Sequence, residues 1–237
     1  MAIPLSGEIL EQLVEVDTPT LCNVIEMFDV RPRNVDYTGP EIAARFPELP
    51  RMVGYATTAR YRSATPDDTA NPYAMLTEQL AAIESIPAPR VVVIQDLDEP
   101  PVGASFGGMM ANMYKSVDCR GLITNGAGRD LDEIRSLDFN VYSSSRICSH
   151  AYFRMLEFNV PVTVGGLTVE PGDLLHGDGD GVTKIPAEIA ERLPEVCQEY
   201  LEIEGEMAAT MRAGGPESIQ KAFEASRVRF QALAKKI

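Results

Sequence analysis

Two adjacent residues of opposite charge, Arg129 and Asp130, have the residue types best suited to chemistry in this chain. They end the stretch NGAGRD, which is rich in small residues. A guanidinium presents a planar fork of N–H donors that fits a carboxylate, and an aspartate can hold a hard divalent cation, often through waters. The pair could therefore bind a 2-oxo acid, with Arg129 on the carboxylate and a metal at Asp130 on the keto oxygen. A metal there would stabilise an enolate as a C–C bond breaks.

The same stretch also has a structural interpretation that needs no ligand. Asp130 and Glu133 have the spacing of the N-cap and N3 residues of a capping box, which contributes about 1 kcal/mol. Gly126 and Gly128 would supply the unusual backbone angles of a strand-to-helix turn. Arg129 would then simply be solvated, and spacing alone leaves both interpretations open.

A second candidate site lies in the stretch SFGGMMAN. Gly107 and Gly108 precede a predicted helix, so the amides of Gly108, Met109 and Met110 would project from its N-terminus and attract an anion. A tight turn with close backbone packing is the alternative. This helix entry and Arg129 follow two successive predicted strands, and ligands of α/β sheets bind at the carboxyl ends of strands. We therefore expect the two stretches to converge.

The two histidines invite a metal or general-base interpretation, but both are predicted to be structural. His176 lies in the turn-rich stretch LLHGDGDGV, and His150 lies in CSHAY. Asp178 and Asp180 are expected to form Asx-type turns with the neighbouring glycines. The chain has no Ser-His-Asp order, phosphate loop or G-x-G-x-x-G fingerprint, which argues against kinase, NAD-dehydrogenase and serine-hydrolase classes.

The elements that must position these residues follow an α/β pattern. The apolar run RVVVIQDL predicts a buried strand, and RGLIT and FNVYSSS predict two more, with short helices between them. A further strand is predicted at about 52–61, and the turns after Val160 predict a β-meander. Near the N-terminus, DTPT predicts a helix start with Thr18 as cap and Pro19 in the first turn. Helices are expected from about Ala187 to Arg212 and near 216–235, so we predict a single domain over 1–237 with a helical C-terminal arm at about 187–237.

Composition limits the possible partners. Acidic residues outnumber basic ones 35 to 21, for a formal charge of −14, which argues against nucleic acid as the main partner but not against a small anion in a locally basic pocket. Four cysteines without a C-x-x-C pair predict reduced thiols rather than a zinc site or disulfides. The N-terminus lacks the features of a signal peptide, and no apolar run approaches the roughly 20 residues that span a bilayer. We expect a cytoplasmic protein with no membrane partner.

The order and spacing of several stretches resemble the RraA-like family. This family contains the RNase E regulator proteins and the metal-dependent 4-hydroxy-4-methyl-2-oxoglutarate / 4-carboxy-4-hydroxy-2-oxoadipate aldolases. The resemblance covers most of the chain and rests on the stretches TPTLCNVI, MVGYATTAR, FGGMMANMYKSVDCRGLITNGAGRDLDEIRSLDF and VPVTVGGLTVEPGDLLHGDGDGVTKIP.

The resemblance implies an α/β sandwich with a swivelling-domain-like β core, assembled as a homotrimer or hexamer with sites at subunit interfaces. In the aldolase branch, an Arg-Asp pair binds the pyruvate carboxylate and anchors the metal, and these positions match Arg129 and Asp130. Helix-entry amides that receive the same carboxylate match the stretch after Gly107. Those enzymes also decarboxylate oxaloacetate, because both reactions pass through the pyruvate enolate.

The chain departs from the aldolase pattern at two acidic positions. The family carries an acid, twenty intervening residues and then Arg-Asp; here the acidic position is Gly108. A second acid, in the turn before the pair, is replaced by Asn125. Both changes remove negative charge near the expected metal and should weaken cation binding. The family also uses a C-terminal acid from a neighbouring subunit, for which Glu199, Glu202, Glu204 and Glu206 are candidates.

Two functions therefore follow from the sequence. The first is a lyase that depends on Mg²⁺ or Mn²⁺ and acts on a 2-oxo or hydroxy-dicarboxylic acid, with Arg129 and the Gly108–Met110 amides on the substrate and Asp130 on the metal. The second is a non-catalytic RraA-type regulatory binding protein, which the missing acid at Gly108 favours.

Overall fold

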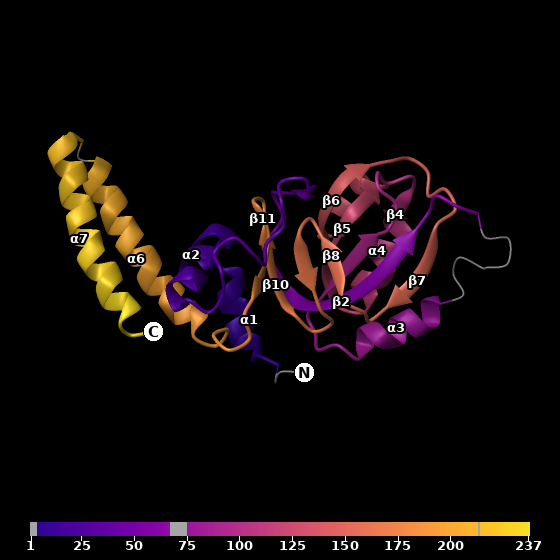
Figure 1. Cartoon of the computed structure of the whole chain (residues 1–237), viewed down its shortest axis with the longest axis horizontal. Coiled ribbons are helices and arrows are strands. Elements are labelled where there is room, and N and C mark those ends of the chain that lie inside the picture. The colour runs from indigo at the N-terminus through magenta and orange to yellow at the C-terminus, as the bar shows by residue number, and fades with distance from the viewer. Residues whose placement is uncertain (1–3, 67–74, 213) are drawn as a thin grey trace.

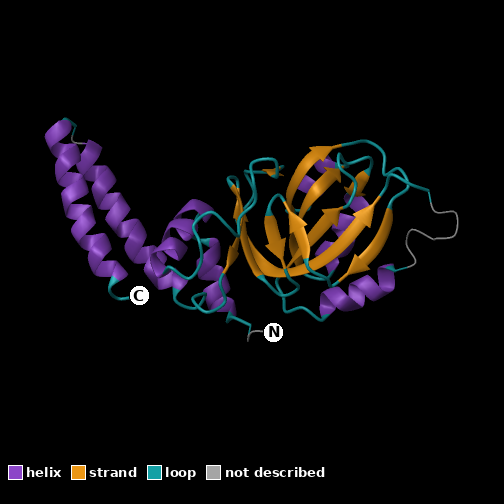
Figure 2. Ribbon diagram, viewed as in Figure 1, coloured by secondary structure: helices purple, strands orange, loops and turns teal. Residues whose placement is uncertain are grey.

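The structure is a computed structural model that describes residues 4–66, 75–212 and 214–237. Within these ranges the chain forms a nine-stranded mixed sheet, a two-stranded hairpin and seven helices (Figures 1 and 2). The helices are α1 (Gly7–Val14), α2 (Thr18–Phe28), α3 (Leu76–Glu84), α4 (Gly108–Ser116), α5 (Leu131–Arg135), α6 (Leu193–Arg212) and α7 (Pro216–Ala234). The strands are β1 (Ala43–Ala44), β2 (Met52–Arg62), β3 (Arg90–Asp96), β4 (Ala104–Phe106), β5 (Cys119–Gly128), β6 (Asn140–Arg146), β7 (Arg154–Phe158), β8 (Val162–Val164), β9 (Leu167–Val169), β10 (Leu174–Asp178) and β11 (Gly181–Ile185).

The large sheet has the strand order β1-β6-β5-β3-β2-β10-β11, with β4 beside β5 and β7 beside β2. Strands β2, β3, β5 and β6 are parallel to one another, and β4 is parallel to β5. The carboxyl ends of these five strands therefore lie at the same edge of the sheet. The α/β class and the strand predicted near 52–61 are confirmed.

Both faces of the sheet are covered, which explains the unbroken apolar run of β3. Side chains of a strand alternate between faces. Val92 and Ile94 pack in one cluster with residues of α3, α4 and α5, whereas Val91 and Val93 pack in another with the β8–β9 hairpin. A third cluster joins α1, α2 and α6 to β10 and β11.

The C-terminal arm consists of α6 and α7, which form a hairpin that extends away from the sheet (Figure 1). Its base is buried against α1 and α2 through Leu193, Val196 and Cys197. The predicted start near Ala187 is six residues too early, because residues 187–192 form turns. Pro194 explains the late start, since proline is tolerated in the first turn of a helix but not in its interior.

The N-terminal helices contact the β10–β11 hairpin through a buried histidine. Asp17, not Thr18, caps α2, because its Oδ1 accepts a hydrogen bond from the Thr20 amide at 2.8 Å. The Thr18 hydroxyl instead lies 2.9 Å from Nδ1 of His176, whose Nε2 lies 3.1 Å from the Leu13 carbonyl. His176 is fully buried with both ring nitrogens hydrogen-bonded, as a structural role requires.

Two further expectations concern cysteines and membranes. All four cysteines are free thiols. In the described part of the chain, every helix is too short or too polar to cross a bilayer.

Candidate functional site

The predicted site residues follow strands that end side by side. Phe106 at the end of β4 pairs with Gly128 at the end of β5, and Gly128 also pairs with Arg146 at the end of β6. The Arg129 amide donates a hydrogen bond to the Phe106 carbonyl at 3.3 Å. The entry to α4 and the Arg129–Asp130 pair therefore lie together at one edge of the sheet, which is the expected convergence.

The glycines of NGAGRD act through packing, and the prediction of a turn with unusual backbone angles is wrong. The stretch continues β5 as far as Gly128, and neither Gly126 nor Gly128 has a positive φ. A Cβ atom on Gly126 would lie 2.0 Å from Oγ of Ser105, and one on Gly128 would lie 2.2 Å from Cζ of Phe106. Only glycine leaves room for β4 to pack against β5 at these positions.

Asp130 reaches across to a neighbouring helix instead of capping its own. It occupies the N-cap position of α5 in the left-handed region, with φ 58° and ψ 32°, and its side chain makes no capping hydrogen bond. Its Oδ2 instead accepts a hydrogen bond from the Gly108 amide at 3.1 Å and lies 3.6 Å from Nε of Arg129. The predicted capping box is wrong, because the left-handed backbone turns the carboxylate towards the N-terminus of α4.

The helix entry predicted to bind an anion is therefore partly occupied by the protein's own carboxylate. Of the three predicted amides, that of Gly108 already donates to Asp130. Met109 is 83% exposed. A cavity of about 220 Å³ is lined by Gly107, Met109, Met110, Arg129 and Asp130, together with Leu76, Ala104, Phe106, His150 and Phe153. The predicted site residues other than Gly108 all line this cavity. Gly108 does not line it, but its amide donates a hydrogen bond to Asp130, which does.

The missing acid at Gly108 has a spatial counterpart in Glu133. A Cβ atom on Gly108 would lie 2.3 Å from Oε2 and 2.5 Å from Cδ of Glu133. The Glu133 carboxylate therefore fills the space that a side chain at position 108 would enter, and its Oε1 accepts a hydrogen bond from Nδ2 of Asn112 at 3.2 Å. The sequence contained a signal for this residue, since Glu133 lies three residues after Asp130, about one helical turn.

A second cavity, of about 580 Å³, adjoins the same pair. It is lined by Arg129, Asp130, Glu133, Arg146 and Cys148, with Gly128, Leu131, Asp132 and Ile147. The Arg129 side chain is 35% exposed and that of Asp130 is 44% exposed. Two guanidinium groups and three carboxylates thus face one open space. The cavity therefore carries both signs of charge, and the arginines offer a carboxylate ligand specific donors rather than a basic surrounding.

The donors around Asp130 are compatible with a cation that keeps most of its water. Among the described residues, no three His, Cys, Asp or Glu side chains are grouped as ligands of one metal ion. Asp130 and Glu133 offer only carboxylate oxygens, and Mg²⁺ is commonly held by one or two carboxylates while it retains several waters. The residues therefore fit Mg²⁺ or Mn²⁺ better than a metal that requires a full protein cage.

The second sequence departure, Asn125, has a structural role away from both cavities. Its Nδ2 donates to the Asp96 carbonyl and its Oδ1 accepts from the Asp96 amide, each at 2.8 Å. The side chain thus joins the ends of β3 and β5 with one donor and one acceptor. An ionised aspartate could supply only the acceptor. These two hydrogen bonds therefore explain why position 125 is an asparagine without reference to a metal.

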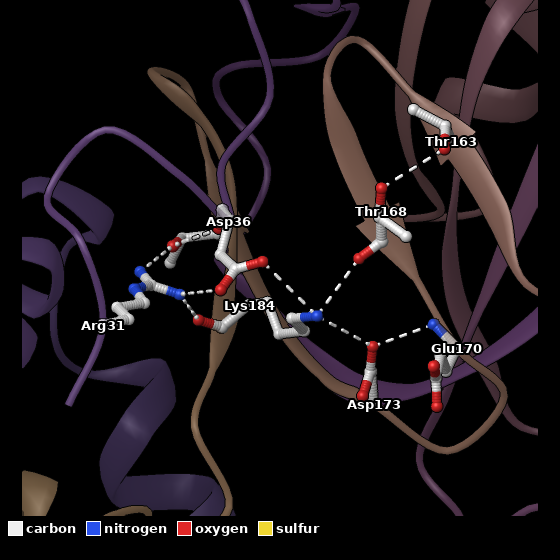
Figure 3. A network of polar contacts seen from close by, with 8 residues as sticks. Arg31, Asp36, Thr163, Thr168, Glu170, Asp173 and Lys184 are labelled. Atoms are coloured by element: carbon white, nitrogen blue, oxygen red, sulfur yellow. Dashed lines mark hydrogen bonds and ion pairs between the residues drawn. The ribbon is translucent and has the colours of Figure 1, made fainter.

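Another cavity, of about 520 Å³, lies beside a network of charged groups on the other side of the molecule. Figure 3 shows Lys184 between Asp36 and Asp173, at 3.4 and 3.3 Å, with Arg31 at 3.5 Å from Asp36. Arg31 also donates to the Lys184 carbonyl at 2.7 Å. Because these four charges are paired with one another, the network ties the loop before β1 to β11 and to the turn before β10.

Comparison with known proteins identifies the chain's relatives. The profile of the RraA-like family, described as Aldolase/RraA, matches residues 18–183. The chain belongs to the RraA-like family. The match contains the entry to α4, the Arg129–Asp130 pair and Glu133.

Individual relatives agree with this family. A protein of Halalkalibacterium halodurans named "Putative 4-hydroxy-4-methyl-2-oxoglutarate aldolase" is 32% identical over 100 residues, which are 42% of this chain and 48% of that protein. The chain thus matches about half the length of this relative. A crystal structure of Streptomyces coelicolor RraAS2, titled an unusual member of the RNase ES inhibitor RraA protein family, has a TM-score of 0.68 and 20% identity and covers 86% of this chain and 98% of its own. An uncharacterised protein from Pseudomonas syringae pv. tomato has a TM-score of 0.74 and 21% identity and covers 95% and 97%.

Proposed function

We propose that the protein is a divalent-metal-dependent lyase that cleaves a C–C bond of a 2-oxo acid through a pyruvate enolate. The observation that carries the proposal is the grouping of one guanidinium and two carboxylates, Arg129, Asp130 and Glu133, on a shared cavity at the carboxyl ends of parallel strands. A cation beside a carboxylate-binding arginine is the arrangement that a 2-oxo acid requires.

Each residue of this group has a distinct role in the proposal. Arg129 binds the substrate carboxylate. Its backbone is held by its amide on the Phe106 carbonyl, and its guanidinium lies beside the Asp130 carboxylate. Asp130 and Glu133 would hold Mg²⁺ or Mn²⁺, which supplies charge stabilisation to the enolate oxygen. The amides of Met109 and Met110 remain as donors at the N-terminus of α4.

The substrate class follows from the reaction and from the name of the relative. We propose that 4-hydroxy-4-methyl-2-oxoglutarate and oxaloacetate are both cleaved, because each yields the pyruvate enolate after C–C cleavage.

The test is pyruvate release from both substrates with Mg²⁺, with Mn²⁺ and with EDTA, corrected for the metal-only rate. Arg129→Ala should lower turnover at least a hundredfold, because a well-placed charged donor at a reacting centre contributes about 10²–10³. Arg120→Ala is the matched control, since Arg120 lies in β5, which ends just before Arg129, is 59% exposed and pairs only with Asp118 among the described residues. No turnover of either substrate with either metal would refute the lyase proposal.

A second candidate is an RraA-type binding protein. It is favoured by the exposed apolar side chains of α7, Phe223 and Val228, which are 57% and 62% exposed. An RNA-cleavage assay with an RNase E-type nuclease tests it. Unchanged cleavage at a large excess of this protein would exclude this function.

Self-association as a trimer or hexamer is part of the proposal. Two of the candidate C-terminal acids are already paired within the arm, Glu199 with Lys236 at 2.8 Å and Glu206 with Arg229. Glu204 in turn forms a side-chain hydrogen bond with Tyr200. A site that needs an acid from a neighbouring copy would therefore draw first on Glu202. Light scattering after size-exclusion chromatography measures the assembly, and a monomer at micromolar concentration would contradict it.

A further inference from the structure

We propose that His150 is the proton-transfer residue of this lyase, a role that rests on the proposed function and deepens it. His150 lies in the segment between β6 and β7, in a turn that sequence analysis predicted to be structural. Its side chain lines the 220 Å³ cavity together with Gly107, Arg129 and Asp130. It is the one imidazole on that wall, because the other histidine, His176, is buried among α1, α2 and β10.

Arg129 and His150 line the same small cavity of about 220 Å³. Proton transfer needs hydrogen-bond contact or one intervening water. A three-carbon enolate bound to Arg129 in this cavity would therefore have His150 among its neighbours. The other walls are mainly apolar, with Leu76, Phe106 and Phe153, and His150 is exposed, so its imidazole can exchange its proton with solvent between turnovers.

The hydrogen bonds of the ring define which nitrogen faces the chemistry. Nδ1 of His150 lies 2.9 Å from the carbonyl oxygen of Ala151. A carbonyl only accepts, so Nδ1 carries the proton of the neutral ring and Nε2 carries the lone pair. The neutral histidine therefore presents a base at Nε2.

The backbone around His150 is held in one conformation. The Ser149 carbonyl accepts from the Ala104 amide at 2.8 Å, and the His150 carbonyl accepts from the Phe153 amide at 3.0 Å. A Cβ atom on Gly103 would lie 2.7 Å from the His150 carbonyl oxygen, so that contact requires glycine. Ala151 has φ 45°, and it is the one residue other than Asp, Asn or Gly with a positive φ among those described. Such an unfavourable conformation persists only where the surroundings impose it.

The proposed step conserves atoms and charge. Nε2 of His150 takes the proton of the C4 hydroxyl, the O–H electrons form the C4 carbonyl, and the C3–C4 bond pair becomes the C2–C3 double bond of the enolate. Nε2–H then returns the proton to C3, and the enolate becomes the keto group of pyruvate. In oxaloacetate the same bond breaks without removal of a hydroxyl proton, so only the return of a proton to C3 involves His150.

The test separates these steps with His150→Gln. Exchange of the pyruvate methyl protons in D₂O, followed by NMR, isolates the transfer at C3. We expect this exchange and the retro-aldol rate to fall at least a hundredfold, with KM changed by less than threefold and CO₂ release from oxaloacetate largely retained. Added imidazole should restore part of the exchange in His150→Ala. Tyr152→Ala, a 59% exposed neighbour that does not line the cavity, is the matched control.

Three results would overturn the proposal in distinguishable ways. Exchange at the wild-type rate in a folded His150→Gln protein would remove the role of His150 and leave the lyase proposal intact. An equal loss of exchange, retro-aldol and decarboxylation without imidazole rescue would show a structural role only. Absence of all three reactions in the wild-type protein would refute the lyase proposal and this inference with it.

Discussion

The Glu133 carboxylate of α5 lies in the space that a side chain at position 108 of α4 would occupy. We therefore predict that an acid at position 108 can replace Glu133. In Gly108→Asp/Glu133→Ala, the acid returns to position 108 and the present one is removed. The Cβ of residue 108 would lie 2.5 Å from the present position of Cδ of Glu133. An aspartate's carboxyl carbon is one C–C bond, about 1.5 Å, from its Cβ. The new carboxyl carbon would therefore lie within about 4 Å of the old one.

The expected magnitudes follow from this geometry. Glu133→Ala alone should weaken Mn²⁺ binding about 10–100-fold, the usual effect of losing a supporting ligand, which corresponds to about 1.4–2.7 kcal/mol. The double variant should bind within about threefold of the wild type. In Gly108→Asp alone, the contact of 2.3 Å is with the exposed end of a flexible side chain, so Glu133 can swing away. A cost of about 1 kcal/mol would lower the Tm by about 2–4 °C.

The assay is the disappearance of the free Mn²⁺ signal in electron paramagnetic resonance as protein is added, with thermal unfolding of each variant alongside. Glu84→Ala, which removes an exposed acid from α3, is the control for net charge. Unchanged Mn²⁺ affinity in Glu133→Ala would show that Glu133 plays no part in cation binding. A double variant as weak as Glu133→Ala would show that the two positions are not equivalent, and either outcome refutes the reasoning.

Three further predictions concern stability. Gly128→Ala should cost about 1–3 kcal/mol, because its Cβ would lie 2.2 Å from the buried Phe106 ring; an unchanged urea midpoint would contradict this. Asn125→Asp should cost about 1–3 kcal/mol at neutral pH, because the donor to the Asp96 carbonyl is lost, and the cost should shrink in acid once the new carboxyl is protonated. Burial lowers the pKa of His176 below 6.5, so below that pH the unfolded chain binds a proton that the native protein does not. Stability should therefore fall as pH drops from about 6.5 towards the lowered pKa. The urea midpoint of the wild type should exceed that of His176→Gln at neutral pH, and the difference should shrink across this range.

Local sequence determined the elements and the pair at the centre of the site. The alternation of β2 and the apolar run of β3 depend on residues that are neighbours in the chain, and both predict strands correctly. The adjacency of Arg129 and Asp130 is itself a sequence property. Because Arg129 and Asp130 follow a predicted buried strand, the sequence also predicts that they lie at the carboxyl edge of the sheet.

The tertiary structure alone decided how these residues meet. The Asp130 carboxylate binds the Gly108 amide, 22 residues earlier in the chain, and the spacing of Asp130 and Glu133 suggested a local capping box instead. Positions 126 and 128 require glycine because Ser105 and Phe106 of another strand, β4, leave no room for a Cβ atom there. Such contacts depend on the packing of segments that are distant in the sequence, for which no local period or spacing carries a signal.

Glu133 shows the difference most clearly. The sequence determined that position 108 has no acid, and from that alone a weakened cation site follows. The fold places the carboxylate of Glu133 into the space above the Gly108 Cα, because the N-termini of α4 and α5 follow adjacent parallel strands. Since a charge acts from where it lies and not from which residue carries it, only the tertiary structure could show that a carboxylate occupies this space.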